Sequence, residues 1–553
     1  MTTSPFLDLV ADRVVVYDGA TGTWLQTQDL SLDDYGGEAM EGCTDILGVT
    51  RPDVIAALHS AYFEVGADVV ETNTFGAFGV PLGEYDIAHR SHEIALANAR
   101  IAREVADGFS TPDRKRFVAG SLGPGTKSPS LSQIRFAELR DHYQVAAEGL
   151  LEGGVDLFIL ETHFDLLAVK AAVIGVRRAM AKVGRQVPIQ CQVTMELTGR
   201  MLVGTEISAA LASIDPLGVD IIGLNCATGP TEMSEHIRHL SQHSRVPISV
   251  LPNAGLPSVV DGKMHYDLTP EQLVEAHTRF VTELGVQVIG GCCGTTPEHL
   301  RQVVEHCRDL TPAPRTPVHE PGATSIYSQV PFHQDTSFMI IGERTNANGS
   351  KKFREAMLEG DYDTCSAMAT EQLKSGAHVL DVCVDYVGRD GTGDMDQIAS
   401  RFATQANAPL VLDSTEPEVM EAGLQWVGGR AILNSANLED GFAEGSRLDR
   451  VFRLAKEYGA AVICLCIDEE GQARTAEWKV RVAKRIAELA RDTYGLANED
   501  LIFDALTFPL STGDDDLRRD AIETMDAIKA IKEEIPGCFT TLGLSNVSFG
   551  LSP

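Results

Sequence analysis

The 553-residue sequence predicts an α/β protein made of two tandem (β/α)₈ barrels of the TIM type, the second lacking its last strand in this chain. Three observations predict this fold. Short apolar runs alternate with segments of helical period. Polar and glycine residues follow nearly every apolar run, where barrel enzymes place their sites. A proline-rich stretch separates the alternation into two series.

The first series fits a closed barrel because strand–helix alternation repeats eight times between residues 13 and 307. Helical patterns such as Asp53–Val65, Ala137–Glu152 and Pro270–Leu284 separate the apolar runs. A doubly wound sheet is the alternative, although it usually has fewer strands. The eight predicted strands are Val14–Tyr17, Val69–Glu71, Phe117–Gly120, Leu157–Leu160, Ile189–Val193, Ile221–Leu224, Ile248–Leu251 and Gln287–Ile289.

A connector is predicted at residues 309–337, which have no helical period and hold four prolines between Pro312 and Pro321. The predicted domains are therefore residues 1–308, the linker 309–337, and residues 338–553. The alternation resumes in the last domain but gives only seven strands, so we expect this chain to be part of a longer protein. These strands are Met339–Ile341, His378–Val382, Pro409–Leu412, Ala431–Leu433, Ala461–Cys466, Leu501–Phe503 and Thr540–Leu544.

Charge and composition exclude several classes of function. With 46 basic and 79 acidic residues the net charge is −33, which argues against a nucleic-acid or anionic membrane surface. No apolar run reaches the roughly 18 residues of a membrane span. The first residues carry neither a basic segment nor a cleavage pattern, and the eleven cysteines are scattered. We therefore expect a cytoplasmic protein with reduced thiols.

A metal site is predicted where Cys292 and Cys293 follow the eighth strand between glycines. Cys226 follows the sixth strand, and both strand ends belong to the same rim of a barrel. Three thiolates with one open position suit Zn²⁺ and would deprotonate a substrate thiol bound there. The alternatives are a buried or redox-active cysteine pair, or a closed structural site with His163 as fourth ligand.

The first barrel resembles the homocysteine S-methyltransferases. The matching motifs are DGATGTWLQ (18–26), ETNTFGA (71–77), GSLGP, PNAGLP, GLNCATGP (223–230) and GGCCGTTPEH (290–299). The resemblance implies Zn²⁺ on the three cysteines, with the homocysteine sulfur as fourth ligand. It also implies that Asp18 and Glu161 bind the amino group and that the amides of Gly19, Ala20 and Thr21 hold the carboxylate. Otherwise Asp18 is only a turn former, and Glu161 only the partner of a basic group.

The second series also ends its strands in polar residues, and several carboxylates and amides at one rim can bind a flat, donor-rich heterocycle. A role as a helix cap or turn former is the alternative for any one of them. The residues concerned are Glu343, Asn346, Asp381, Asp385, Asp413, Asn434, Asp468, Asp504 and Asn546.

This half resembles the pterin-binding barrel of the corrinoid-dependent methyltetrahydrofolate methyltransferases. The matching motifs are IIGERTN (340–346), GAHVLDVCVD (376–385), LDST (412–415), ILNSAN (432–437), DEEGQA (468–473) and GLSNVSFG (543–550). The resemblance implies that Asp413, Asn434 and Asp504 bind the pterin and that Asn546 lies near N5, the methyl-bearing atom. Asp504 and Asn546 are the expected catalytic residues, and Glu343 and Asn346 complete the substrate-binding set. Cys383 departs from the family, which usually has Asn there.

The order of the two barrels resembles the cobalamin-dependent methionine synthases. That resemblance implies transfer of a methyl group from 5-methyltetrahydrofolate, through a corrinoid, to zinc-activated homocysteine, giving methionine and tetrahydrofolate. No Asp-x-His-x-x-Gly corrinoid motif occurs in the sequence. Cobalamin is therefore expected from a corrinoid-binding domain downstream or in a separate protein. Asn546 can donate only a hydrogen bond, so no general acid is assigned to N5.

Two other functions stay open on the sequence. One is a zinc-dependent homocysteine S-methyltransferase with a different methyl donor, whose second barrel is a non-catalytic folate-binding or docking module. The other is a scaffold with a closed structural zinc site that only binds folate or a partner.

Overall fold

The computed structural model describes residues 4–260, 263–512 and 519–550. Contacts divide the chain into two units, at His319 and Glu320, and each is described by itself. Among the described residues, no helix combines the length and the apolar character needed to cross a bilayer.

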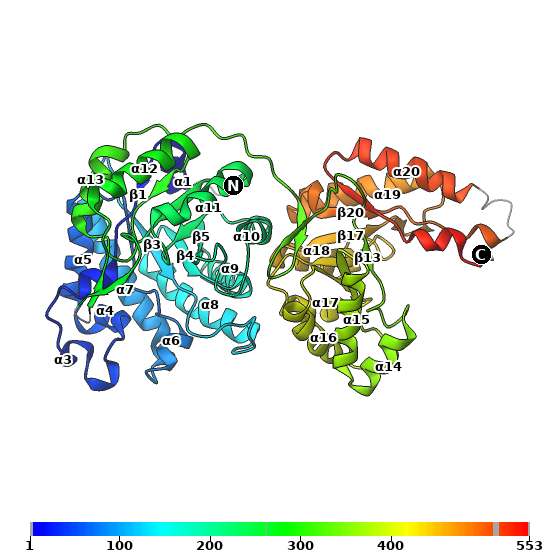
Figure 1. Cartoon of the computed structure of the whole chain (residues 1–553), viewed down its shortest axis with the longest axis horizontal. Helices are drawn as coiled ribbons and strands as arrows, with labels where there is room; N and C mark the ends of the chain where they lie inside the picture. Colours follow the sequence, from blue (N-terminus) through cyan, green and yellow to red (C-terminus); the bar gives the residue numbers. More distant parts are fainter. Residues whose placement is uncertain (1–3, 261–262, 513–518, 551–553) are drawn as a thin grey trace. The chain divides into compact units, whose positions relative to one another are not determined.

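The first unit is a closed barrel of eight parallel strands (Figure 1). Neighbouring strands follow the order β1-β10-β7-β6-β5-β4-β3-β2, and a bridge between Tyr17 and Val69 joins β1 to β2. All eight predicted runs form strands, which confirms the predicted barrel. The strands are β1 Val15–Val16, β2 Val69–Glu71, β3 Phe117–Leu122, β4 Leu157–His163, β5 Ile189–Val193, β6 Ile221–Asn225, β7 Ile248–Leu251 and β10 Val288–Ile289.

One long helix follows each strand and covers the outside of the barrel. Gly149 and Gly175 let three of these helices pack closely: a Cβ on either would lie 2.5 Å from a carbonyl oxygen of the preceding helix. Shorter helices and a β8–β9 hairpin (Ser258–Val260, Lys263–His265) occur in the connecting loops. The long helices are α5 Pro52–Glu64, α7 Ser91–Phe109, α8 Phe136–Gly153, α9 Leu166–Val183, α10 Ile207–Ile214, α11 Pro230–His243, α12 Pro270–Leu284 and α13 Pro297–Cys307.

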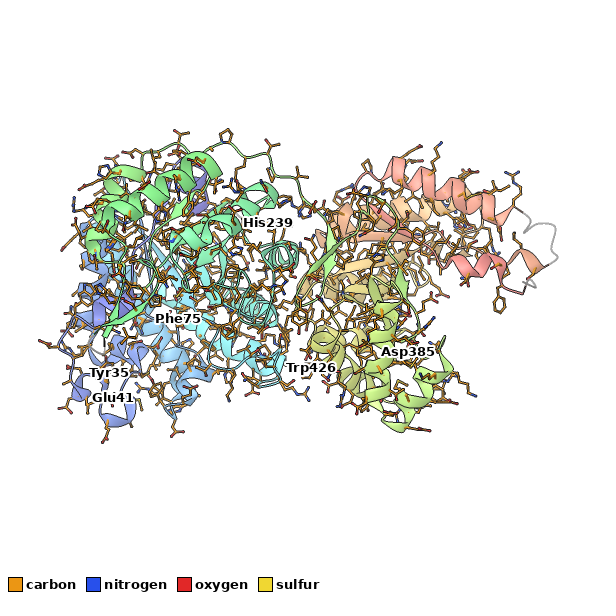
Figure 2. The ribbon with its side chains drawn as sticks, viewed as in Figure 1. Tyr35, Glu41, Phe75, His239, Asp385 and Trp426 are labelled. Carbon is orange, nitrogen blue, oxygen red and sulfur yellow. The ribbon has the colours of Figure 1, made fainter. Side chains whose placement is uncertain are left out.

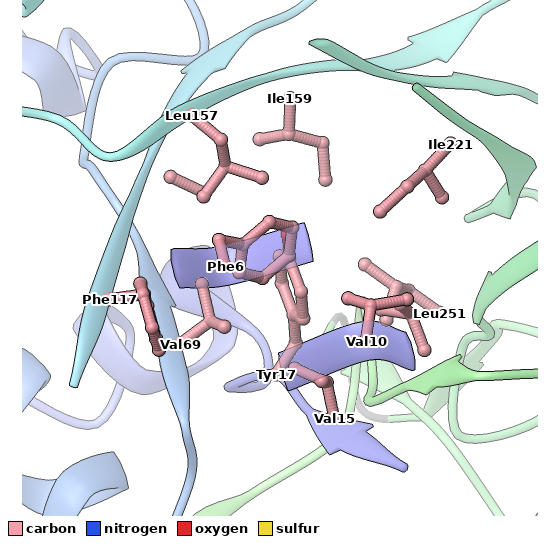
Figure 3. Packing of buried hydrophobic residues seen from close by; sticks show 12 residues of the cluster. Phe6, Val10, Val15, Tyr17, Val69, Phe117, Leu157, Ile159, Ile221 and Leu251 are labelled. Carbon is pink, nitrogen blue, oxygen red and sulfur yellow. The ribbon is translucent and has the colours of Figure 1, made fainter. Parts of the chain in front are cut away.

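Helix α1 (Pro5–Asp12) fills the barrel from the N-terminal side of the strands, a feature that the strand count does not predict. The Ser4 side chain accepts a hydrogen bond from the Phe6 amide and so caps the helix. Phe6 is fully buried and its ring makes edge contacts with the rings of Tyr17 and Phe117 (Figure 3). Val10 lies beside it in the same cluster. The interior at this end is therefore a packed core.

The second unit is a seven-stranded parallel sheet in sequential order, with helices between the strands. Of the described residues, β13 and β21 each pair on one side only, as expected for a barrel without its eighth strand. The strands are β13 Ile341–Gly342, β14 Val379–Cys383, β15 Leu410–Asp413, β16 Ile432–Ala436, β17 Ala461–Leu465, β20 Leu501–Asp504 and β21 Phe539–Thr541. The helices are α14 Lys351–Glu359, α15 Tyr362–Lys374, α16 Gly391–Gln405, α17 Pro417–Leu424, α18 Arg447–Tyr458, α19 Ala476–Leu489 and α20 Asp520–Glu534.

The stretch expected as a linker is shared between the units. Arg315 donates hydrogen bonds to the Ser244 and Val246 carbonyls of the first unit. Farther along, β11 (Gly322–Thr324) and β12 (Gln329–Pro331) form a hairpin in the second unit. Ala323 of this hairpin and Phe332, which follows β12, pack in the core under the sheet.

Replacing Phe6 with Ala should destabilise the first unit by about 3–5 kcal/mol, because a fully buried ring is lost from a packed core. Leu197, which is 68% exposed, provides the control, and Leu197→Ala should change stability by less than about 0.5 kcal/mol. Denaturant unfolding of the full chain measures both. Equal effects of the two substitutions would show that α1 does not stabilise the barrel.

Candidate functional site

Three cysteines come together at the C-terminal rim of the first barrel. The Sγ atoms of Cys226, Cys292 and Cys293 all lie within 4.8 Å of one another, and those of Cys226 and Cys293 are 3.9 Å apart. In the described part of the chain, no other group of three or more His, Cys, Asp or Glu side chains is this close. The predicted ligand set is therefore assembled, and His163 is not part of it.

The backbone leaves strand geometry where these cysteines lie. β6 ends at Asn225, and Cys226 and Ala227 both have φ = 59°, a left-handed conformation that is costly for residues other than glycine. β10 ends at Ile289, and a turn closes where the Thr295 amide donates to the Cys292 carbonyl over 3.1 Å. Both cysteine segments are thus turned away from the strand direction, which lets their thiols converge.

Strand β7 holds the two segments in register. The Cys226 amide donates to the carbonyl of Leu251, the last residue of β7, over 3.2 Å. The Cys292 amide donates to the next carbonyl, that of Pro252, over 2.8 Å. The main chain at the end of β7 therefore holds the backbone of both cysteine segments in place.

The thiols share their protons unequally. Hydrogen bonds from Cys226 and from Cys292 lower the pKa of Cys293 to about 3, although burial opposes this shift. Hydrogen bonding to the other two sulfurs, together with burial, raises the pKa of Cys292 well above its usual value. The cluster therefore readily carries one negative charge.

The sulfur geometry fits a zinc ion. Tetrahedral Zn–S bonds of about 2.3 Å place two sulfurs about 3.8 Å apart, close to the distance between Cys226 and Cys293. His163, the alternative fourth ligand, is fully buried, and burial lowers its pKa to about 3. Among the described residues no His, Asp or Glu joins the three sulfurs, and three sulfurs are the donor set expected of a zinc site with an exchangeable position.

Beside the cysteines lies a cluster of buried carboxyl groups, which we call the carboxyl pocket. Asp18 at the end of β1 is 2% exposed, and Glu161 on β4 is 6% exposed. Burial raises the pKa of both. The Ser121 hydroxyl donates to one oxygen of Glu161 over 2.5 Å, and the amide of Asn225 donates to the other over 3.0 Å. Carboxylates in such surroundings favour a cationic ligand.

Asn225 connects this carboxyl pocket to the sulfur cluster. The same side-chain nitrogen that donates to Glu161 lies 3.9 Å from the sulfur of Cys292. The side-chain oxygen of Asn225 accepts from the Thr162 amide over 2.7 Å, which fixes the orientation of the side chain. Neither Asn225 nor Ser121 was among the predicted site residues, although both lie within recognised motifs.

The turn after β1 is tightly packed. A Cβ on Gly19 would lie 2.7 Å from the hydroxyl of Thr295, so the chain requires glycine there. The Ala20 amide already donates to the Thr295 carbonyl over 3.3 Å. Of the three amides expected to hold a carboxylate, that of Ala20 therefore has a partner within the protein. Thr21 begins the short helix α2 (Thr21–Leu25).

In the second unit, Asn346 lies between two carboxyl groups, one on β14 and one at the end of β15. Its side-chain nitrogen donates to Asp381 over 2.8 Å and to Asp413 over 3.0 Å. Burial, followed by the charge of Asp413, raises the pKa of Asp381 to about 7. Burial, followed by the charge of Asp385, raises the pKa of Asp413 to about 6. The predicted residues Asn346 and Asp413 thus belong to one network.

A pocket of about 400 Å³ brings together the two predicted catalytic residues, Asp504 at the end of β20 and Asn546 in the 3-10 helix η9 (Leu544–Ser548). Burial raises the pKa of Asp504 to about 6. Its carboxyl oxygen accepts a hydrogen bond from the Leu506 amide over 2.8 Å. Other residues that line the pocket are Gln472, Leu506, Thr507, Phe508, Pro509, Gly543 and Phe549.

The remaining predicted positions differ in their surroundings. Glu343 is exposed, and Asn434 is partly buried beside Asp413 in the register of the sheet. Cys383 is buried, and the Asn348 side chain lies 3.5 Å from its sulfur. Asp385 (Figure 2) accepts hydrogen bonds from the hydroxyls of Ser414 and Thr415, which tie the loop after β14 to the loop after β15.

Comparison with known proteins gives two family matches. Residues 15–307 match the model described as homocysteine S-methyltransferase, and residues 342–553 match the model described as pterin binding enzyme. A solved homocysteine methyltransferase, MmuM from Escherichia coli in its metallated form, is 20% identical. The match covers 54% of this chain and 99% of that one with a TM-score of 0.44, which adds nothing to the family assignment.

Two proteins with similar sequences are named methionine synthase, which agrees with the matches to both family models. The chain is 53% identical over 547 residues to a methionine synthase of Mycobacterium tuberculosis and 52% identical over 553 residues to one of Mycobacterium leprae. Each match covers 99% of this chain but 46% of the relative, so the chain spans about half the length of these proteins. From the match over residues 15–307, the chain belongs to the homocysteine S-methyltransferase family.

Proposed function

We propose that this chain is the substrate-binding part of a cobalamin-dependent methionine synthase. The first unit would bind homocysteine and the second 5-methyltetrahydrofolate, with the methyl group passing between them on a corrinoid. The observation that carries the proposal is the cluster of Cys226, Cys292 and Cys293 beside the buried carboxyl pocket. A small substrate that carries both a thiol and an ammonium group would fit these two sites, with its thiol at the cysteine cluster and its ammonium group at the carboxyl groups.

Cys226, Cys292 and Cys293 would hold the zinc ion. Zinc bound there would lower the pKa of a substrate thiol, which makes it a nucleophile near neutral pH. Asp18 and Glu161 would bind the ammonium group, and Asn225 would keep Glu161 at a fixed distance from the sulfurs. The amides of Gly19 and Thr21 would hold the carboxylate.

In the second unit, Asp504 and Asn546 would bind the pterin ring from two sides of the same pocket. Asp504 would accept hydrogen bonds from ring nitrogens in its ionised form, and Asn546 would donate one near N5. Asn346 would orient Asp413 and Asp381 toward the same ligand, with Asn434 and Glu343 at the edge of the site. The relatives' greater length is consistent with a corrinoid-binding domain outside this chain.

Cys226→Ser should reduce bound zinc from about one ion per chain to well below half, because only two thiolates remain for a soft metal. Cys43→Ala is the matched control, since Cys43 is buried in the same unit away from the cluster. Metal analysis after dialysis against a weak chelator measures both. Full zinc occupancy in Cys226→Ser would contradict the ligand set.

Affinity for 5-methyltetrahydrofolate should fall as the pH is lowered below about 6, because Asp504 then becomes protonated and loses acceptor capacity. Asp504→Asn should weaken binding at pH 7 by about tenfold or more and should leave only the part of this pH dependence that Asp381 and Asp413 cause. Asp492→Asn, at an exposed ion pair with Arg491, is the control. Isothermal titration of the full chain gives the affinities. Unchanged affinity in Asp504→Asn would remove Asp504 from the site.

The overall reaction can be tested in two halves with free cobalamins. The zinc-loaded chain should form methionine from homocysteine and methylcobalamin, and should methylate cob(I)alamin with 5-methyltetrahydrofolate. Cys226→Ser should lose the first reaction and keep the second, and Asp504→Asn should do the reverse. A different outcome would support the alternative function. If homocysteine is methylated by another methyl donor, and the folded chain does not methylate cob(I)alamin with 5-methyltetrahydrofolate, the chain is a homocysteine methyltransferase with a non-catalytic second barrel.

A further inference from the structure

A third carboxyl group, that of Glu71, lies in the first unit's carboxyl pocket and has no role in the function proposed above. Glu71 is the last residue of β2, the strand that closes the barrel against β1. Its amide donates to the carboxyl oxygen of Asp18 over 3.0 Å. Its side chain is in hydrogen-bond contact with the carboxyl group of Glu161. Glu71 therefore contacts both residues expected to bind the ammonium group.

This contact requires a proton between the two side chains. An ionised carboxylate only accepts hydrogen bonds, so two carboxyl groups can be hydrogen-bonded to each other only when one is protonated. The charged neighbours of Glu71 are Glu161 and Asp18, which are both acidic. Two ionised carboxylates in hydrogen-bond contact are strongly disfavoured, as in carboxyl pairs that share one proton.

The hydrogen bonds indicate which group holds the proton. Glu161 accepts from Ser121 over 2.5 Å and from Asn225 over 3.0 Å, and donors of this kind stabilise a carboxylate. Asp18 accepts from the Glu71 amide. Burial, then the charges of Glu161 and Asp18, raises the pKa of Glu71 well above its usual value. The neutral member of the pair is therefore Glu71.

We propose that Glu71 is a positioning residue that remains protonated and donates a hydrogen bond to the Glu161 carboxylate, which it orients toward the ammonium group of the amino-acid substrate. This inference rests on the proposed binding of homocysteine. A neutral Glu71 leaves this group of carboxyls with less unbalanced negative charge than three carboxylates would. The pocket can thus form before the substrate arrives.

Other titratable groups that face Glu71 do not account for its proton. Tyr17 and Tyr62 lie close enough to feel its charge, and burial raises the pKa of both well above 10. Tyr17 donates to the side chain of Gln190, and Tyr62 to the Ala20 carbonyl. Both phenols therefore remain neutral at physiological pH, and the acidic groups facing Glu71 are Asp18 and Glu161.

Substitutions at position 71 separate a hydrogen-bond donor from a negative charge. Glu71→Gln keeps the shape and a donor toward Glu161, so homocysteine affinity of the zinc-loaded chain should stay within about threefold of wild type. Glu71→Ala loses the donor and should weaken binding by about tenfold or more, as should Glu161→Gln, which removes the counter-charge. Glu275→Ala, at an exposed position on α12, is the control that should not change affinity. Isothermal titration calorimetry measures all four variants.

Infrared difference spectroscopy tests the proton directly. The spectrum of wild type minus Glu71→Gln at neutral pH should contain the carbonyl band of a protonated carboxyl group. A carboxylate band in its place, or a Glu71→Gln variant that binds homocysteine as poorly as Glu161→Gln, would overturn the inference, since position 71 would then need a negative charge. Failure of the wild type to bind homocysteine would instead contradict the proposed function, while the infrared band would still decide the protonation of Glu71.

Discussion

Closure of the first sheet is the constraint on which the cluster of three cysteines depends. Tyr17 pairs with Val69 to join the first and last strands of the order, so all eight carboxyl ends meet at one rim. β7 then lies between β6 and β10 and hydrogen-bonds to both cysteine segments through the carbonyls of Leu251 and Pro252. Sulfurs that are 66 and 67 positions apart in sequence thereby come within 4.8 Å of one another.

The polar rim contains features that raise the free energy of the folded barrel, and other contacts offset them. Left-handed backbone at Cys226 and Ala227 costs on the order of 1–3 kcal/mol for each residue, and the buried carboxyl groups are desolvated. Side chains such as Asn225 and Ser121 satisfy those carboxyl groups with hydrogen bonds, while α1 and the packed core at the opposite end stabilise the barrel. Stability and site chemistry therefore occupy opposite ends of the same strands.

Strand positions and the convergence of the three cysteines were predictable because both follow from local patterns. Apolar runs mark the strands, and the rule that parallel strands align their carboxyl ends brings Cys226 to Cys292 and Cys293. Other features depend on packing that the sequence does not display. The plugging helix α1, the β11–β12 hairpin within the expected linker, and the bridge from Glu161 through Asn225 to Cys292 are of this kind. Glu71 was visible in the ETNTFGA motif, but only the contact with Glu161 gives it a role.

The arrangement of the three cysteines predicts an open fourth position on a bound metal ion. X-ray absorption spectroscopy at the zinc edge of the metal-loaded chain, with and without homocysteine, tests it most directly. Three sulfur ligands and one lighter atom are expected without substrate, and four sulfur ligands after homocysteine is added. An unchanged spectrum in the presence of saturating homocysteine, or four protein ligands before it is added, would contradict the claim.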